Sequence, residues 1–120
     1  MRSVSGKQEE EMNVAMHIND ADLAQAFRGY VERRLRFTLG RFGGRLGSVT
    51  VRIGGDGPTD KRCRISTEVL PFGRVAVEER DSDLFAAIDR ATGRIGRMFG
   101  RELERVRDAR VSRESVRLAA

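Results

Sequence analysis

The chain has one cysteine and one histidine among its 120 residues. With one thiol it can form neither an internal disulfide nor a cysteine zinc cluster. No Cys/His pair, HExxH-type box or Ser/His/Asp set is recognisable. We therefore predict no catalytic residue, no metal site, no cofactor and no small-molecule substrate. A carboxylate enzyme built on Glu79, Asp81 and Asp83 stays open as a weak alternative.

Long apolar runs and large aromatics are also scarce. The chain has no tryptophan, one tyrosine and two prolines. No apolar run approaches the roughly 20 residues that span a bilayer, and residues 1–11 lack the apolar core of a secretory signal. These absences predict a mainly aliphatic core and a cytoplasmic protein that has no membrane partner. The single cysteine fits a reducing compartment.

Positive charge is plentiful. Lys and Arg number 23 against 18 Asp and Glu, which gives a formal charge of +5, and nearly all the basic residues are arginine. Arginine binds phosphate through a planar, bidentate fork. A polyanionic partner is therefore predicted, nucleic acid before an anionic membrane. The alternative is a solvated surface in an arginine-rich sequence background.

Periodicity predicts an α+β fold in the order β-α-β-β-β-α. The strands are expected at 12–18, 48–53, 61–70 and 74–79, and the helices at 21–42 and 82–107. Three strands joined by short turns should form an antiparallel meander, and the helical crossover should place the first strand parallel to its neighbour. Each strand has one apolar face, so both helices should cover one face of a four-stranded mixed sheet.

The predicted elements define one domain, with tails at both ends. Residues 12–107 form the domain, 1–11 an N-terminal disordered tail, and 108–120 a C-terminal tail that either extends the last helix or frays. Asn19 or Asp20 should cap the first helix, and Asp81 or Ser82 the last. Glycines at 40, 43, 44 and 47 should end the first helix. The segment 54–60 is expected to be a loop.

The last helix has three distinct faces. An apolar stripe predicts docking on the core, and beside it lies a row of arginines. The row consists of Arg90, Arg94, Arg97, Arg101 and Arg105. On a third face lie Gly93, Gly96 and Gly100, each costing a helix roughly 1 kcal/mol relative to alanine. Tight packing against the first helix is the favoured reason, and contact with another protein is the alternative.

The first helix adds a second basic group. Arg33 and Arg36 lie off its apolar stripe, and two helices on one face of the sheet would bring them near the arginine row. Arg41 falls near the helix end, where positive charge also suits the helix dipole. The uncovered sheet face lacks aromatics, which argues against base stacking there. Backbone recognition of RNA through the helices is the better fit.

Several motifs resemble the ribosome hibernation promoting factor family, also called ribosome-associated inhibitors or ribosomal subunit interface proteins. In the first half they are Tyr30-Val31-Glu32-Arg33-Arg34-Leu35, Arg41-Phe42 and Ser48-Val49-Thr50-Val51. In the second half they are Asp60-Lys61-Arg62-Cys63, Val75-Ala76-Val77-Glu78 and Asp83-Leu84-Phe85-Ala86-Ala87-Ile88-Asp89. The resemblance spans residues 12 to 107 and implies the same β-α-β-β-β-α fold.

The resemblance also implies a function and a set of site residues. The family's basic positions correspond to Arg33 and Arg36 on the first helix and to Arg94, Arg97 and Arg101 on the last. In the family these helices contact small-subunit ribosomal RNA in the channel used by messenger and transfer RNA, which blocks translation in resting or stressed cells. The expected partners are therefore the small subunit and its RNA.

Geometry alone adds Arg90 and Arg105 to the predicted RNA-binding set, which also includes Arg41. We expect a monomer without the C-terminal extension that drives ribosome dimerisation in long family members. The alternative function is a protein-interaction module that uses the sheet edge or the glycine face of the last helix.

Overall fold

The computed structural model describes residues 12–18, 21–55 and 57–119, with the backbone alone at 21–24 and 110–119. In chain order the elements are β1 (Val14–Ile18), α2 (Ala21–Leu39), the 3-10 helix η1 (Gly40–Arg45), β2 (Leu46–Gly55), β3 (Lys61–Val69), β4 (Gly73–Asp81) and α3 (Leu84–Ala119). The predicted β-α-β-β-β-α order is confirmed. The predicted tail at 1–11 and the predicted caps Asn19 and Asp20 lie outside the described residues.

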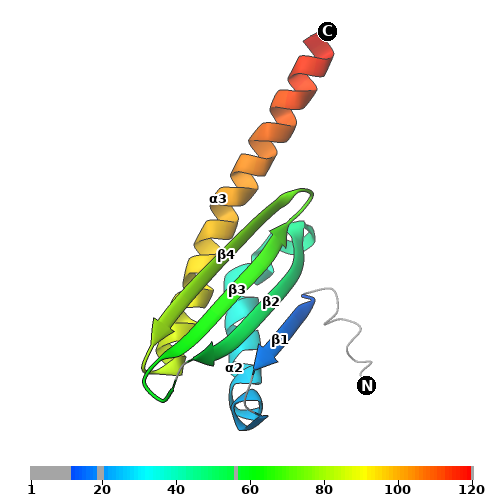
Figure 1. The fold of residues 1–120 in the computed structure, drawn as a ribbon. Coiled ribbons are helices and arrows are strands. Elements are labelled where there is room, and N and C mark those ends of the chain that lie inside the picture. Colours follow the sequence, from blue (N-terminus) through cyan, green and yellow to red (C-terminus); the bar gives the residue numbers. More distant parts are fainter. Residues whose placement is uncertain (1–11, 19–20, 56, 120) are drawn as a thin grey trace, which may run out of the picture.

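The four strands form one mixed sheet in the order β1-β2-β3-β4 (Figure 1). β1 pairs parallel with β2, whereas β2, β3 and β4 form an antiparallel meander. The crossover through α2 explains the parallel pair, because a helix returns the chain to the end at which the preceding strand began. The predicted topology is therefore confirmed.

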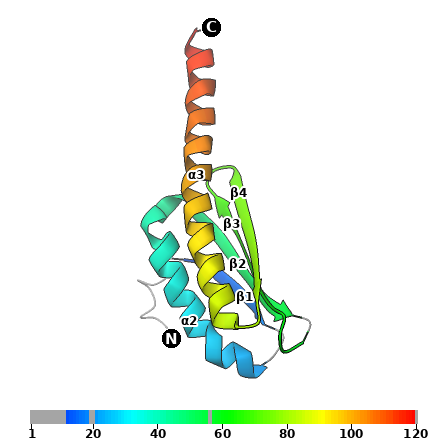
Figure 2. The ribbon, with the colours of Figure 1, turned by 90° about the vertical axis from the view of Figure 1, so that its left-hand side faces the viewer.

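Both long helices lie on the same face of the sheet (Figure 2). α3 packs over β3 and β4, and α2 packs beside α3 and contacts β1. Between helices and sheet lies an aliphatic core that includes Leu35, Ile65 and Ile95, with Phe99 its largest fully buried side chain. The other face of the sheet has no layer over it in the described structure, and there Arg52 lies opposite Arg64.

The first helix ends earlier than predicted. α2 stops at Leu39 and continues as the 3-10 helix η1, inside which Gly43 has a φ of 53°. Residues with a side chain rarely adopt this left-handed conformation, so glycine suits the break. As a consequence Arg41 lies in η1, two residues beyond the end of α2, and the basic residue in the last turn of α2 is Arg36.

The last helix is capped by a different residue from those predicted. The Asp83 carboxylate accepts a hydrogen bond from the Phe85 amide at 3.0 Å, and the Asp83 carbonyl accepts one from the Ala87 amide. Asp83 is therefore the N-cap, in place of Asp81 or Ser82. Asp81 acts one step earlier, because its carboxylate accepts the Asp83 amide at 2.9 Å.

Each strand boundary differs from its prediction by no more than two residues, and β2 begins at Leu46, so Gly47 lies in this strand and not at the helix end. β2 extends through Gly54 and Gly55, which were assigned to the loop, because both pair with β3. The helix predicted at 82–107 runs from Leu84 to Ala119, so the segment after Arg107 is helical. This last part of α3 projects past the end of the sheet (Figures 1 and 2). Among the described helices, none is apolar over a length that would cross a membrane.

Candidate functional site

The two long helices run parallel and touch along one seam. Tyr30 donates a hydrogen bond to the Asp89 carboxylate, and the Arg34 Nε donates to the Thr92 hydroxyl at 3.3 Å. Further along, Phe42 of η1 stacks on Phe99 with 4.4 Å between ring centroids. The contacts advance together along both chains, so α2 and η1 follow α3 over about three turns.

Glycines on α3 make the close approach possible. A Cβ on Gly96 would lie 3.0 Å from the Thr38 carbonyl oxygen and 3.1 Å from its Cβ, and one on Gly100 would lie 3.8 Å from the Phe42 ring. The favoured prediction, tight packing against the first helix, is confirmed for both. The alternative of a free glycine face is wrong there, because α2 and η1 occupy it. Only the sheet-edge form of the protein-interaction hypothesis stays open.

Gly93 has a different neighbour. A Cβ at this position would have the Arg97 Nη1 as its nearest contact, at 3.6 Å. The same relation recurs on α2, where a Cβ on Gly29 would lie 3.4 Å from the Arg33 Nη1. Both arginines therefore fold back along their own helix over a glycine four residues earlier, and both are exposed.

The first half of the arginine row is held by carboxylates of β4. Arg90 contacts Glu79 at 3.2 Å and Asp81 at 3.0 Å, and it donates to the Arg80 carbonyl. Arg94 binds the second oxygen of Glu79. The guanidinium of Arg94, together with that of Arg90, lowers the pKa of Glu79. The Asp83 amide and then Arg90 lower the pKa of Asp81. We call Arg90 and Arg94 the clamped arginines.

These contacts weaken the carboxylate-enzyme alternative. A general acid at neutral pH needs a raised pKa, whereas the pKa values of Glu79 and Asp81 are lowered. Asp83 is occupied as a helix cap. Cys63 is buried, and its burial raises the pKa of the thiol to about 12, so it is a core side chain and not a nucleophile. No metal-ligating cluster occurs among the residues that the structure describes.

The second half of the row is different. Arg97 and Arg101 are exposed, and neither has a hydrogen bond or an ion pair with any described residue. At the far end, Arg105 pairs with Glu102 on the same helix at 2.8 Å. We call Arg97 and Arg101 the open arginines, because their guanidinium donors face solvent.

The predicted basic residues of α2 and η1 also differ from one another in their contacts. Arg33 is exposed and makes no ion pair or hydrogen bond within the described chain. Arg36 is exposed and has an interaction of its own. The guanidinium of Arg41 lies 4.8 Å from the centre of the Phe42 ring. Because Thr38 touches Gly96 and Phe42 lies near Gly100, the end of α2 and η1 lie beside this part of α3.

Sequence reasoning missed one prominent side chain of this surface. Phe37 follows Arg36 on α2 and is 80% exposed. It falls outside the apolar stripe that was used to predict the helix, and that was the available signal. The spacing of four residues within α2 places Arg33 one turn before Phe37 on the same face of the helix, whereas Arg41 lies in η1, beyond the end of α2.

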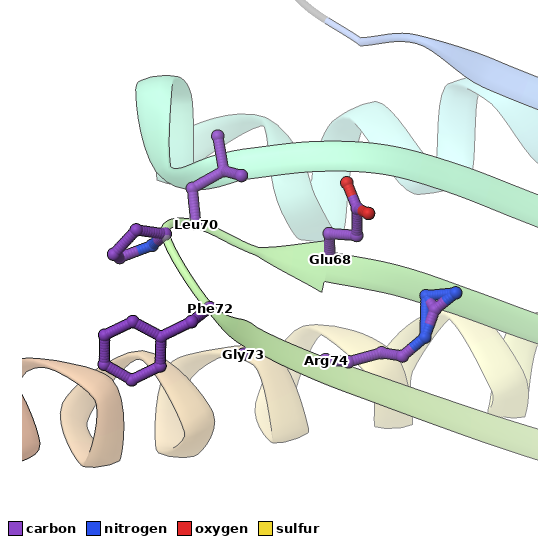
Figure 3. A pocket seen from close by; sticks show the side chains of 6 residues that line it. Glu68, Leu70, Phe72, Gly73 and Arg74 are labelled. Carbon is purple, nitrogen blue, oxygen red and sulfur yellow. The ribbon is translucent and has the colours of Figure 1, made fainter.

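A separate shallow pocket lies at the turn between β3 and β4 (Figure 3). Its volume is about 240 Å³, and it is lined by Glu68, Leu70, Pro71, Phe72, Gly73 and Arg74. It contains one carboxylate and one guanidinium on the strands, with apolar side chains at the turn. None of the predicted site residues lines this pocket, so the arginine surface is a distinct feature.

Comparison with known proteins agrees with the fold and with the motifs. A family model described as sigma 54 modulation protein / S30EA ribosomal protein matches residues 14–107. Among solved structures, the N-terminal domain of Protein Y from Thermus thermophilus is 34% identical, with a TM-score of 0.64. That match covers 75% of this chain and 98% of the other. Among curated proteins, no significant match was found.

Proposed function

The chain belongs to the sigma 54 modulation protein / S30EA ribosomal protein family, the ribosome hibernation factor family that its motifs resemble, and from this premise we propose that it binds small-subunit ribosomal RNA and silences translation. Membership makes it a ribosome-associated hibernation factor. The RNA contact, the small subunit as its site and the block of translation are the proposed part.

The observation that supports the proposal is the pair of open arginines on a rigid support. Arg97 and Arg101 are on a helix whose opposite side is anchored by Ile95, Phe99 and other buried residues. Their guanidinium groups have no partner in the described chain, so phosphate would meet donors that need not first leave a carboxylate. Arg33 extends this surface across the seam.

The eight arginines predicted from the sequence are given different weights. Arg33, Arg97 and Arg101 form the centre of the proposed RNA surface, with Arg36 and Arg41 at its edge. Arg90, Arg94 and Arg105 first stabilise the fold through Glu79, Asp81 and Glu102. Their contribution to RNA binding is therefore proposed to be secondary.

The proposed mechanism is occlusion. The protein acts as a monomer in the cytoplasm, and its arginine surface binds ribosomal RNA phosphates in the channel used by messenger and transfer RNA. Occupancy of this channel in resting or stressed cells would prevent initiation without a chemical step. Affinity should fall steeply with salt, by roughly three in log K per decade of salt for three phosphate contacts.

The test is co-sedimentation of the purified protein with small ribosomal subunits. The double variant Arg97→Glu/Arg101→Glu should lose at least about a hundredfold in affinity, because each charged hydrogen bond is worth roughly 1.5–3 kcal/mol. Arg94 is left intact, since its change would also free Glu79 and would mix stability with binding.

A matched control has the same change in charge on the opposite face of the sheet. Arg52 and Arg64 are both exposed cross-strand neighbours there, and Arg52→Glu/Arg64→Glu should keep affinity within a few-fold of wild type. Equal losses in the two variants would mean that only net charge matters. Wild-type affinity of Arg97→Glu/Arg101→Glu would contradict the proposal.

A further inference from the structure

Four large apolar side chains are exposed in the described chain: Phe37, Leu70, Phe72 and Phe85. Three have local neighbours that account for them. Phe85 lies 4.6 Å from Phe27 and 5.0 Å from Tyr30 between ring centroids, and Leu70 and Phe72 line the pocket at the β3–β4 turn. Phe37 is the most exposed of the four, and its ring has no ring contact with the described residues.

Exposure of one apolar side chain is ordinary on a protein surface, so the surroundings of Phe37 decide its meaning. Arg33 precedes it by four residues, one turn earlier on the same face of α2. Its neighbour Thr38 packs on Gly96, the residue before Arg97. Phe37 and Arg97 are each one residue from that contact, and both are exposed. The exposed ring is therefore one helical turn from Arg33 and, across the seam, starts from a position next to that of Arg97.

The backbone beneath this ring is held firmly. Leu35 and Leu39 are fully buried, and Thr38 is pressed against α3. A phenylalanine side chain has only two rotatable bonds, so little entropy is lost when its ring meets a partner. The fold thus presents a flat, apolar face at a fixed place beside phosphate-binding groups.

The chemistry of the surface favours one kind of partner. A protein that docks through apolar contact needs a wider patch than one ring, and the other residues here are arginines that favour negative charge. An unpaired nucleotide fits both kinds of side chain, because its base stacks on an aromatic face and its phosphates bind guanidinium groups. Bases within an A-form duplex are already stacked on each other and cannot reach a side chain in this way.

We propose that Phe37 is a base-stacking residue: it takes an unpaired RNA base on its ring while Arg33 and Arg97 hold the neighbouring phosphates. This inference rests on the proposed function, because it specifies the kind of RNA that the arginine surface binds. It predicts a preference for single-stranded, bulged or looped RNA over continuous duplex. It also assigns stacking to α2, whereas the described face of the bare sheet has no phenylalanine, tyrosine or tryptophan on its strands.

The first experiment compares side chains at position 37. Phe37→Ala and Phe37→Leu should weaken binding to small subunits and to an unstructured oligoadenylate by about fivefold or more, the usual loss when one stacking aromatic is removed. Phe37→Tyr should bind like wild type. Because the arginines stay, the salt slope of all three variants should be that of wild type, whereas Arg97→Glu/Arg101→Glu lowers the slope. Thermal unfolding checks that each variant is folded.

The second experiment uses the absence of tryptophan from the chain. In Phe37→Trp, the single indole should be quenched on adding oligoadenylate and should change little with an RNA duplex of equal length. Phe72→Trp, at the β3–β4 turn, is the matched control and should respond to neither RNA.

The outcomes separate the inference from the function beneath it. If Phe37→Ala binds subunits like wild type while Arg97→Glu/Arg101→Glu fails, the stacking role is overturned and the ribosome-binding role stands. If Phe37→Leu binds oligoadenylate as well as Phe37→Tyr does, an apolar contact is enough and the stacking role is overturned. An unquenched indole in Phe37→Trp at saturating oligoadenylate also overturns the inference.

Discussion

The clamped and the open arginines of α3 belong to one row with one spacing, yet they have opposite environments. Arg90 and Arg94 grip Glu79 and Asp81, whereas Arg97 and Arg101 have no such partner in the described chain. The cause is the direction of β4. Its carboxyl end, with both acids, lies beside the start of α3, and its first residue, Gly73, lies against Glu102 and Val106. Beyond Arg94, α3 therefore no longer lies beside Glu79 and Asp81.

This contrast shows that a basic row cannot be taken as a single site. An arginine that already has a carboxylate must exchange one partner for another when phosphate arrives, so its net gain is small. An arginine in solvent gives up only its bonds to water, so its net gain from a charge-assisted hydrogen bond to phosphate is larger. The half of the row whose arginines have no carboxylate partner in the described chain is therefore set by the preceding strand, β4.

The largest expected effect concerns the packing beneath the open arginines. Gly96→Val should lower the free energy of unfolding by about 1–3 kcal/mol, because its side chain would press on the Thr38 carbonyl and force the helices apart. Chemical denaturation measures this loss. RNA binding should weaken as well, since Arg97 would move away from α2.

Gly93→Ala is the matched control on the same helix. Its Cβ would meet only the flexible end of Arg97, at 3.6 Å, and replacing glycine in a helix should raise stability by about 0.5–1 kcal/mol. Equal destabilisation by both variants would show that the seam at Gly96 is not specially tight.

The sequence could predict the features that depend on local periodicity. The apolar and basic stripes of α3 follow from a repeat of 3.6 residues, and the faces of the strands from a repeat of two, so the fold and the arginine row were accessible. The contacts between side chains of different elements could not be predicted in this way. Asp81 and Asp83 are both of a residue type that caps helices. The ion pair between Asp81 and Arg90 depends on the position of β4 beside α3, which the sequence does not show.

Two other features show the same limit. The glycine face predicted close packing, but neither spacing nor composition could name Thr38 as the residue opposite Gly96. Phe37 could have been noticed, because it is a large apolar residue that falls outside the apolar stripe of the first helix. Its exposure was harder to foresee, because the end of α2 and the turn into η1 decide which side of the helix stays uncovered.

An intermediate effect is expected when Glu79, the carboxylate that holds both clamped arginines, loses its charge. Glu79→Gln frees Arg94 and one contact of Arg90, so the salt slope of RNA binding should steepen by up to about two in log K per decade. Stability should fall by about 1 kcal/mol or less, the usual value of a partly exposed ion pair. Filter binding at several salt concentrations measures the slope.

The control for this variant is Glu78→Gln. Glu78 precedes Glu79 on β4, points to the bare face of the sheet and pairs there with Arg64 and Arg80. It removes the same charge without touching α3. If both variants steepen the slope equally, overall charge and not the released guanidinium groups is responsible, and the distinction between clamped and open arginines fails.

The smallest effect is a dependence of stability on pH that belongs to the clamp alone. Arg94 lowers the pKa of Glu79 in the folded protein below its ordinary value of 4.5. A group whose folded pKa is lowered stabilises the fold above the unfolded pKa, and this contribution is lost as pH falls through the folded pKa. The free energies of unfolding of wild type and Glu79→Gln should therefore differ at pH 7 and converge progressively below about pH 4.5.

The control is Arg97→Gln, which should shift the free energy of unfolding by the same amount at every pH in that range, because no described carboxylate pairs with Arg97. A difference between wild type and Glu79→Gln that persisted unchanged to the lowest pH would mean that Glu79 stabilises the fold by packing and not by holding the arginines.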